Sequence, residues 1–190
     1  YEAPHLLHEL LETLSRASID YLTYQIHHGV DCVMIFDTWG GILPYQAYKD
    51  LSLVYMKKMR DALKANPKTR ETPVILFTKQ AAPWYADLSK VQPDAIGADW
   101  TMPLSQVRAL VGKEIVLQGN LDPFVLYGSH DHIEQAVGAL LADLGVDGKH
   151  IFNLGHGMLP DLDPDKVHFM IETLHRLSPQ YQPQPITKEG

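Results

Sequence analysis

The stretch "DCVMIFD" at residues 31–37 determines the fold class, because it is a continuous apolar run that is too short to form a helix. Such a run is typical of a strand that is buried on both faces of a parallel sheet. Upstream of it, apolar residues recur at helical spacing from Pro4, and Gly29 is placed to end that helix. The chain is therefore predicted to start with an amphipathic helix that leads into a buried strand.

The same alternation of helix and strand continues along the chain. Four more short apolar runs predict strands at 73–79, 94–100, 114–120 and 150–156. Helical patterns are predicted at 44–65, 82–91, 103–111, 130–144 and 164–177. Ser129 and Asp163 are placed as N-caps, and Gly112 and Gly145 are placed to end helices. Residues 179–190 have no apolar period and are expected to form a loose tail.

Strands that alternate strictly with helices predict an α/β fold with a parallel sheet, either an open doubly wound sheet or a (β/α)8 TIM-type barrel. No predicted strand is followed by the G-x-G-x-x-G pattern of a dinucleotide-binding fold, which favours the barrel. The chain contains about five strand-helix units, so a closed barrel needs about three more strands from outside this chain. We expect residues 1–178 to be part of a single barrel domain.

The chain is acidic, with 23 Asp and Glu residues against 16 Lys and Arg residues and a formal net charge of −7. This balance argues against a nucleic-acid surface, which needs clustered positive charge. The single cysteine, Cys32, excludes a disulfide framework or a thiolate metal cluster built from this chain, and indicates a cytoplasmic setting. No apolar run approaches a membrane span and the first residues lack signal-peptide features, so no membrane partner is expected.

Polar side chains or tryptophan follow each of the five predicted strands. They are Asp37, Thr38 and Trp39; Thr78, Lys79 and Gln80; Asp99 and Trp100; Gln118, Asn120 and Asp122; and Asn153 and His156. The carboxyl ends of parallel strands converge on one crevice, which makes these residues candidates for a site. The alternative is that the Asp and Asn residues after the last three strands, Asp99, Asn120, Asp122 and Asn153, only cap helices and hold turns.

His156 stands between two glycines, which leave its ring uncovered and let the backbone approach a ligand closely. Histidine is well suited to hydrogen bonding or proton transfer at neutral pH, so His156 either contacts a ligand or is a buried residue bonded to a backbone carbonyl. Thr38 has no activating base nearby in the sequence, so it is interpreted as a hydroxyl donor to a ligand. A catalytic zinc is not expected, because no strand end supplies a second His or a Cys.

Four stretches, "FDTWGGILP", "GADWT", "VLQGNLDP" and "FNLGHGMLPDLDP", occur in this order along the chain. Together they resemble the C-terminal portion of the uroporphyrinogen decarboxylase family, over about Tyr1 to about Leu177. The resemblance implies a (β/α)8 barrel and a lyase of haem biosynthesis that removes CO₂ from four acetate side chains. By the same resemblance, uroporphyrinogen III is expected to be converted to coproporphyrinogen III without a cofactor or a metal. The resemblance also implies a homodimer.

The resemblance implies roles for three residues. His156 corresponds to the family histidine that contacts a substrate carboxylate, and it is the expected catalytic residue. Thr38 corresponds to a Ser or Thr that contacts the substrate, and Phe36 is expected on the wall of the cleft. The family's arginine motif, its Asp that binds the pyrrole NH groups and a substrate Tyr are expected outside this chain. The segment alone is therefore expected to be inactive.

Two other functions stay open beside this one. A zinc-dependent corrinoid or thiol methyltransferase of the same superfamily shares the barrel, but it holds zinc through a His and two Cys at strand ends. Cys32 is the single cysteine of the chain and is predicted to lie inside a strand, which argues against that reading. A non-catalytic tetrapyrrole-binding module, in contrast, would bind a porphyrinogen without turnover.

Overall fold

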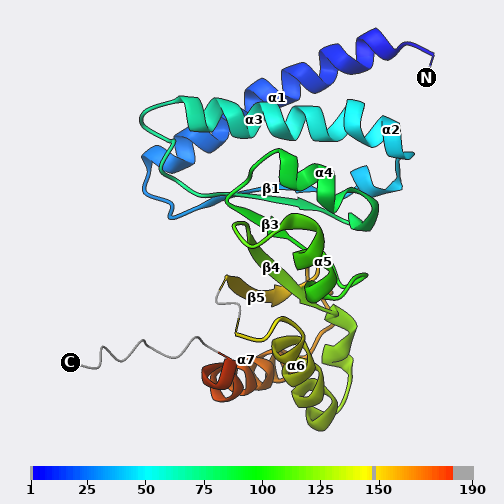
Figure 1. The fold of residues 1–190 in the computed structure, drawn as a ribbon, viewed down its shortest axis with the longest axis vertical. Coiled ribbons are helices and arrows are strands. Elements are labelled where there is room, and N and C mark those ends of the chain that lie inside the picture. The colour runs from blue at the N-terminus through cyan, green and yellow to red at the C-terminus, as the bar shows by residue number, and fades with distance from the viewer. Residues whose placement is uncertain (1, 147–148, 182–190) are drawn as a thin grey trace.

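The computed structural model describes residues 2–146 and 149–181, and Figure 1 shows a sheet in the middle of the molecule with pairs of helices at its two ends. The strands are β1 (Val33–Asp37), β2 (Val74–Thr78), β3 (Ala95–Gly97), β4 (Val116–Leu121) and β5 (His150–Leu154). Each strand pairs in parallel with the next one along the chain. The five predicted strands are therefore confirmed.

The order of the sheet is β1-β2-β3-β4-β5, which is also the order of the chain. A doubly wound sheet reverses its order at a switch point, whereas a (β/α)8 barrel adds each strand beside the previous one. The sequential order therefore confirms the barrel-type α/β fold over the doubly wound alternative. Within the described residues, β1 and β5 each pair on one side only, so the sheet is an open section of a barrel wall.

Burial in the sheet depends on the position of each strand. Every residue of β2 and β3 is buried. β1 is buried at Val33 but leaves Phe36 65% exposed, so the prediction of burial on both faces is wrong for this strand. The physical reason is that β1 lies at the edge of an open sheet. The prediction that Cys32 lies inside this strand is also wrong, since Cys32 precedes Val33 and is exposed.

The helices cover one face and both ends of the sheet (Figure 1). The α-helices of the described residues are α1 (Pro4–His27), α2 (Tyr45–Tyr48), α3 (Val54–Ala65), α4 (Tyr85–Lys90), α5 (Leu104–Val111), α6 (His130–Leu144) and α7 (Pro164–Leu177). α1 packs against α3 at one end, and α6 packs against α7 at the other. The helix predicted at 44–65 is divided by a π-helical turn at Lys49–Leu53, and that predicted at 82–91 starts with a 3₁₀ turn at Ala82–Trp84.

The predicted helix ends are confirmed. The side chains of Ser129 and Asp163 accept hydrogen bonds from backbone N–H groups of the first turn, at 3.3 and 2.9 Å. Such caps satisfy donors that the helix itself leaves unpaired. Gly112 and Gly145 follow α5 and α6 with φ angles of +83° and +63°, a conformation that favours glycine.

The segment after α7 differs in part from the predicted loose tail. Ser178–Tyr181 forms a 3₁₀ turn, and Tyr181 packs against the hydrophobic cluster formed by β4, β5, α6 and α7. The prediction is therefore wrong for residues 179–181, because an aromatic side chain there finds an apolar surface. Residues 182–190 lie outside the described residues.

Two hydrophobic cores meet at β4. The larger core lies between the sheet and the helices from α1 to α5, and Leu117 of β4 belongs to it. The smaller core joins β5, α6 and α7, and Leu121 of β4 belongs to that one. Each fully buried side chain of this size stabilises the fold by about 1.5–3 kcal/mol. The sheet section is thus supported on its helical face along its whole width.

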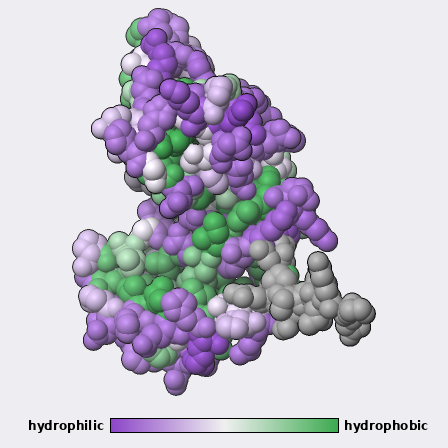
Figure 2. Space-filling model, turned by 90° about the vertical axis from the view of Figure 1, so that its left-hand side faces the viewer, coloured by the Kyte–Doolittle hydropathy of each residue, from purple (hydrophilic) through white to green (hydrophobic). Residues whose placement is uncertain are grey.

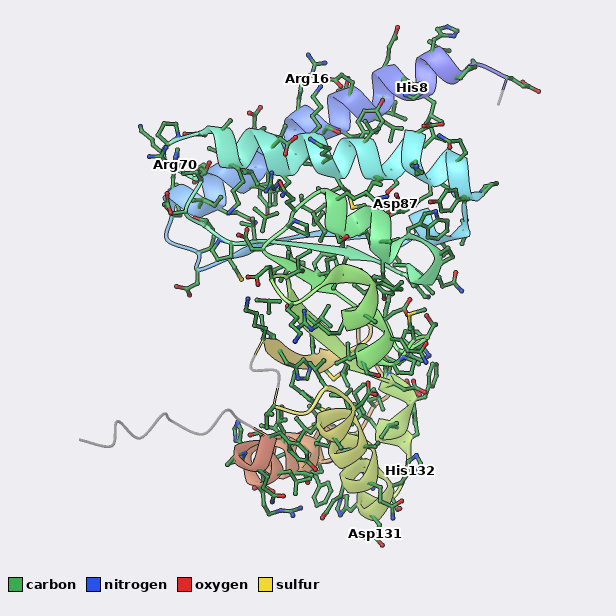
Figure 3. All side chains as sticks on the ribbon, viewed as in Figure 1. His8, Arg16, Arg70, Asp87, Asp131 and His132 are labelled. Carbon is green, nitrogen blue, oxygen red and sulfur yellow. The ribbon has the colours of Figure 1, made fainter. Side chains whose placement is uncertain are left out.

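Asp87 of α4, labelled in Figure 3, joins α4 to α2. Its carboxylate accepts a hydrogen bond of 2.5 Å from the Tyr45 hydroxyl and one of 2.9 Å from the Lys90 ammonium. The Tyr45 bond, followed by the Lys90 bond, lowers the pKa of Asp87. The charged form of Asp87 therefore stabilises the folded state above the pKa of the unfolded chain, about 3.9, and this stabilisation is lost as the pH falls through the lower folded pKa.

We expect Asp87→Asn to lower the free energy of unfolding by about 1 kcal/mol at pH 7. The difference from the parent protein should hold down to about pH 5 and then shrink as the pH falls below about 4. Urea denaturation followed at several pH values measures this difference. Asp20→Asn, on the exposed face of α1, is the matched control. A difference that grows on acidification would contradict the assignment.

Candidate active site

A hollow of about 420 Å³ lies where the strands end. Successive residues of a strand face opposite sides of the sheet, so one faces the helices and the next faces the hollow. Those buried under the helices are Leu76, Ile96 and Leu117. Those that line the hollow are Phe77, Gly97 and Gln118. In Figure 2 the surface is hollowed between the part of the molecule with α1 and α3 and the part with α6 and α7, and hydrophobic residues in green lie along the hollow. The lining consists of Met34, Phe36, Thr38, Phe77, Gly97, Ala98, Gln118, Asn153, Leu154, Gly155, His156, Gly157 and Met158.

The structure brings the three predicted site residues to this one hollow. Thr38 follows β1 and His156 follows β5, so they approach the hollow from the two edges of the sheet. Phe36 lies on the wall, with its ring centroid 5.8 Å from that of Phe77. A hydroxyl and an imidazole are therefore held beside two aromatic rings, which suits a ligand with both apolar rings and polar substituents.

The ring of His156 lies between Phe77 and Trp100, with centroid distances of 6.2 and 6.3 Å. The residue is half-buried, and its side chain makes no hydrogen bond within residues 2–146 and 149–181. The alternative in which the ring only bonds a backbone carbonyl therefore has no support in the described residues. The ring nitrogens of His156 are therefore not occupied by hydrogen bonds to other described residues.

Gly155 sets the position of the loop that carries His156. A Cβ atom on Gly155 would lie 2.6 Å from the backbone nitrogen of Trp100, which is closer than atoms can pack. The loop after β5 therefore rests directly on the backbone after β3. Gly157, on the other side of His156, has nothing within 4 Å of such an atom.

Asp99 and Asn120 hold the strand ends beneath the hollow. The fully buried Asp99 carboxylate accepts hydrogen bonds from the N–H of Gln80 and from the N–H and hydroxyl of Thr101, the latter two at 2.9 and 2.5 Å. The Asn120 amide donates to the carbonyls of Asp99 and Met102, both at 2.7 Å. These contacts fit the alternative in which both residues hold turns.

The remaining acidic and amide side chains at strand ends also bond to nearby backbone. Asp37 accepts a hydrogen bond of 2.7 Å from the N–H of Gly40, and Asp122 and Asn153 accept bonds of 2.9 Å from N–H groups one or two residues away. Asp37 also accepts a bond from the Ser52 hydroxyl. Among the polar strand-end residues, Thr38, Gln118, Asn153 and His156 line the first hollow.

A second, smaller hollow of about 190 Å³ lies on the other side of His156. Its lining consists of Lys79, Trp100, Pro123, Phe124, Tyr127, His156, Gly157, Leu159 and Leu162. The Tyr127 hydroxyl donates a 2.7 Å hydrogen bond to Asp161, and this bond raises the pKa of Tyr127. His156 is thus shared between two neighbouring hollows.

Apart from Phe36 and Trp100, sequence reasoning missed the apolar side chains that line the two hollows. Met34 and Phe77 were hidden inside apolar runs, although each lies two residues from another inward-facing position, as alternation in a strand requires. Phe124 and Tyr127 lie in the turn after β4, where a sequence offers no periodic signal. Their rings stack at a centroid distance of 6.2 Å.

Comparison with known proteins identifies the family of this site. The family described as Uroporphyrinogen decarboxylase (URO-D) matches residues 1–177. The chain belongs to the uroporphyrinogen decarboxylase family. The proteins named uroporphyrinogen decarboxylase from Chromohalobacter salexigens and Hydrogenovibrio crunogenus are 47% and 44% identical to it over 181 residues. In both cases the match covers 95% of this chain and 51% of the relative, so the chain spans about half the length of these uroporphyrinogen decarboxylases.

A solved structure of a methyltransferase from Methanosarcina mazei is similar to the fold of this uroporphyrinogen decarboxylase family member. The TM-score is 0.72 at 18% identity, over 85% of this chain and 47% of the other. The likeness supports the fold alone. It agrees with a sheet section that belongs to a larger barrel.

The described part of this uroporphyrinogen decarboxylase family member does not offer the ligand set of a metal site. No group of three or more His, Cys, Asp or Glu side chains there is placed to hold a metal ion. Cys32 precedes β1 and His156 follows β5, so they lie toward opposite ends of the parallel strands. They cannot be ligands of one zinc ion, as the methyltransferase reading requires. No helix among the described residues is long and apolar enough to cross a membrane.

Proposed function

We propose that this chain supplies the C-terminal part of the barrel of a uroporphyrinogen decarboxylase. Such a lyase removes CO₂ from the four acetate side chains of uroporphyrinogen III and leaves coproporphyrinogen III. The observation that carries the proposal is the convergence of Thr38 and His156, from opposite edges of the sheet, on a hollow walled by aromatic rings. Family membership supports the reaction class.

The reaction needs an acceptor for the electron pair of the bond to CO₂. Protonation of the pyrrole ring provides it, because the cationic ring takes up the pair as the carbon–carbon bond breaks. The resulting exocyclic methylene then gains a proton to become a methyl group, and the ring carbon releases its own proton. Overall, one proton replaces one CO₂ at each acetate.

The residues of this chain fit the binding part of that chemistry. His156 donates an N–H to a substrate carboxylate and fixes its direction, and the Thr38 hydroxyl contacts the same substrate. Phe36 and Phe77 provide apolar faces for the pyrrole rings. Hydrogen bonds to a charged acceptor are stronger than those between neutral groups, so a carboxylate is the favoured partner of the His156 ring.

The cations that the substrate requires are scarce in this chain. Uroporphyrinogen carries eight carboxylates, whereas Lys79 is the single Lys or Arg among the described residues that line the two hollows. Arginine is the side chain best suited to bind carboxylates, because it binds them bidentately. We therefore expect the remaining strands of the barrel to supply the missing positive charge.

The isolated 190-residue chain is expected to decarboxylate no uroporphyrinogen. It lacks the positive charge needed to hold the substrate and stabilise its transition state. Anaerobic incubation followed by oxidation and chromatographic counting of porphyrin carboxylates measures this. The complete polypeptide, meaning a chain of the length of the relatives that contains this segment, is the positive control. Products with fewer than eight carboxylates from the isolated chain would contradict the expectation.

The same assay on the complete polypeptide tests the proposed function. Formation of coproporphyrinogen from uroporphyrinogen supports it, and binding without any product would support a non-catalytic tetrapyrrole-binding module instead. Loss of activity on metal chelation would oppose a cofactor-independent mechanism. We further propose a cytoplasmic homodimer that needs neither nucleic acid nor membrane, and analytical ultracentrifugation of the complete polypeptide tests the oligomeric state.

A further inference from the structure

The second hollow has a different character from the first. It holds about 190 Å³, which is below the range of about 300–1,000 Å³ that is usual for pockets that enclose a small molecule. It therefore has room for a substituent and not for a ring system. His156 lines both hollows, so a substituent in the second one belongs to a molecule whose body occupies the first.

The walls of the second hollow are apolar and fixed. Phe124 and Tyr127 stack on each other after β4, and the Tyr127 hydroxyl bonds to Asp161 in the loop after β5. The hydrogen bond joins two loops that are more than 30 residues apart in the chain, and the stacking fixes both rings within the first of them. Trp100 and Leu162 are further parts of this wall. The hollow is thus formed before any ligand arrives.

Lys79 brings a positive charge to this hollow. The ammonium of Lys79 lies 5.9 Å from the ring centroid of Trp100, a distance at which a cation is attracted to the face of an aromatic ring. Lys79 is half-buried, and no carboxylate of the described residues lies within ion-pair distance of it. Most other lysines do have such a carboxylate within 4.0 Å: Lys49, Lys57, Lys58, Lys64, Lys90 and Lys149.

We infer that the second hollow is a carboxylate subsite, in which Lys79 pairs with a short carboxyalkyl side chain of the molecule that occupies the first hollow. The inference rests on the proposed function, because it takes that molecule to be the porphyrinogen. A half-buried ammonium without a counter-ion, next to apolar walls, pairs favourably with an anion that brings its own methylene groups. The methylenes contact Trp100 and Leu162 while the carboxylate contacts Lys79.

The carboxylate held by Lys79 is one that the substrate keeps. Decarboxylation removes the negative charge from the departing group, so a cation paired with that group would stabilise the ground state more than the transition state. A cation paired with a retained carboxylate stabilises both states equally. Lys79 therefore contributes to substrate binding and not to the chemical step.

The experiment compares Lys79→Met, Lys79→Arg and Lys113→Met in the complete polypeptide, with uroporphyrinogen as the substrate. Lys113 is exposed between α5 and β4, near the opposite ends of the strands, so its replacement removes the same charge away from the hollow. We expect Lys79→Met to raise KM about 10-fold and to change kcat less than about twofold. Lys79→Arg should keep KM within about threefold of the parent, and Lys113→Met should change neither constant.

The outcomes separate this inference from the proposed function. A parent enzyme that produces no coproporphyrinogen defeats the proposed function itself. If the parent is active, a KM of Lys79→Met within twofold of the parent overturns the subsite, as does a fall in kcat at unchanged KM. Thermal melts check that each variant folds. Lys79→Gln, which keeps a polar side chain, replaces Lys79→Met in the same comparison if the latter does not fold.

Discussion

Replacing His156 by asparagine in the complete polypeptide is expected to lower kcat/KM for uroporphyrinogen about 10- to 100-fold. His156 faces both hollows, and its ring nitrogens have no hydrogen-bond partner among the described residues. A hydrogen bond to a charged group contributes about 1.5–3 kcal/mol, which corresponds to this range of rates. Asparagine has a shorter side chain and cannot carry a proton, so the loss should appear in kcat as well as in KM.

The same substitution should leave the fold intact, because the His156 ring is half-buried and meets the rings of Phe77 and Trp100 in edge contacts. Steady-state kinetics and chromatography of the partly decarboxylated intermediates measure the effect. His168→Asn is the control, since the His168 ring lies on the exposed face of α7, paired with Glu172. Kinetics equal to those of the parent would return His156 to a role in shaping the turn.

Replacing Asp99 by alanine is expected to lower the free energy of unfolding by about 2–4 kcal/mol. The carboxylate is fully buried and accepts hydrogen bonds from Gln80 and from two groups of Thr101. Alanine would leave these donors without an acceptor in a site closed to water, which costs more than the bonds themselves contribute. The loops that carry Lys79 and Trp100 would lose the carboxylate to which both are hydrogen-bonded.

Urea denaturation of the complete polypeptide measures this loss. Asp99→Asn retains one carbonyl acceptor and should lie between the parent and Asp99→Ala. Asp20→Ala, on the exposed face of α1, is the matched control and should change stability by less than about 0.5 kcal/mol. A stability of Asp99→Ala within that same margin of the parent would show that water or a rearranged loop replaces the carboxylate.

The sequence predicted the strands and helices well because its signals are local. A short apolar run, a capping Ser129 and a terminating Gly145 each act within a few residues, and the structure has each of them where the pattern indicates. The divided helix at Lys49–Leu53 has no such signal, because its apolar period continues through the turn. The exposure of β1 depends on its position at the edge of the sheet. A local sequence pattern cannot show which strands lie beside it.

The site, too, could be predicted where the signal is local and not where it depends on contacts between distant segments. Parallel strands end at one edge, so the sequence alone assigns Thr38 and His156 to one hollow. The sequence could not show whether Asp99 and Asn120 hold turns or contact a ligand, since the same residue types do both. The second hollow depends on loops that meet only through the Tyr127–Asp161 contact, and no spacing in the sequence indicates that meeting.

The strictly sequential pairing of the sheet also affects how the protein is made. Each described strand pairs only with the strands directly before and after it in the chain, so every new strand leaves the ribosome with its partner already synthesised. The wall can therefore extend strand by strand during translation. In a barrel whose last strand is β5, the outer edge of β5 pairs with the first strand, and that closure waits for the end of synthesis.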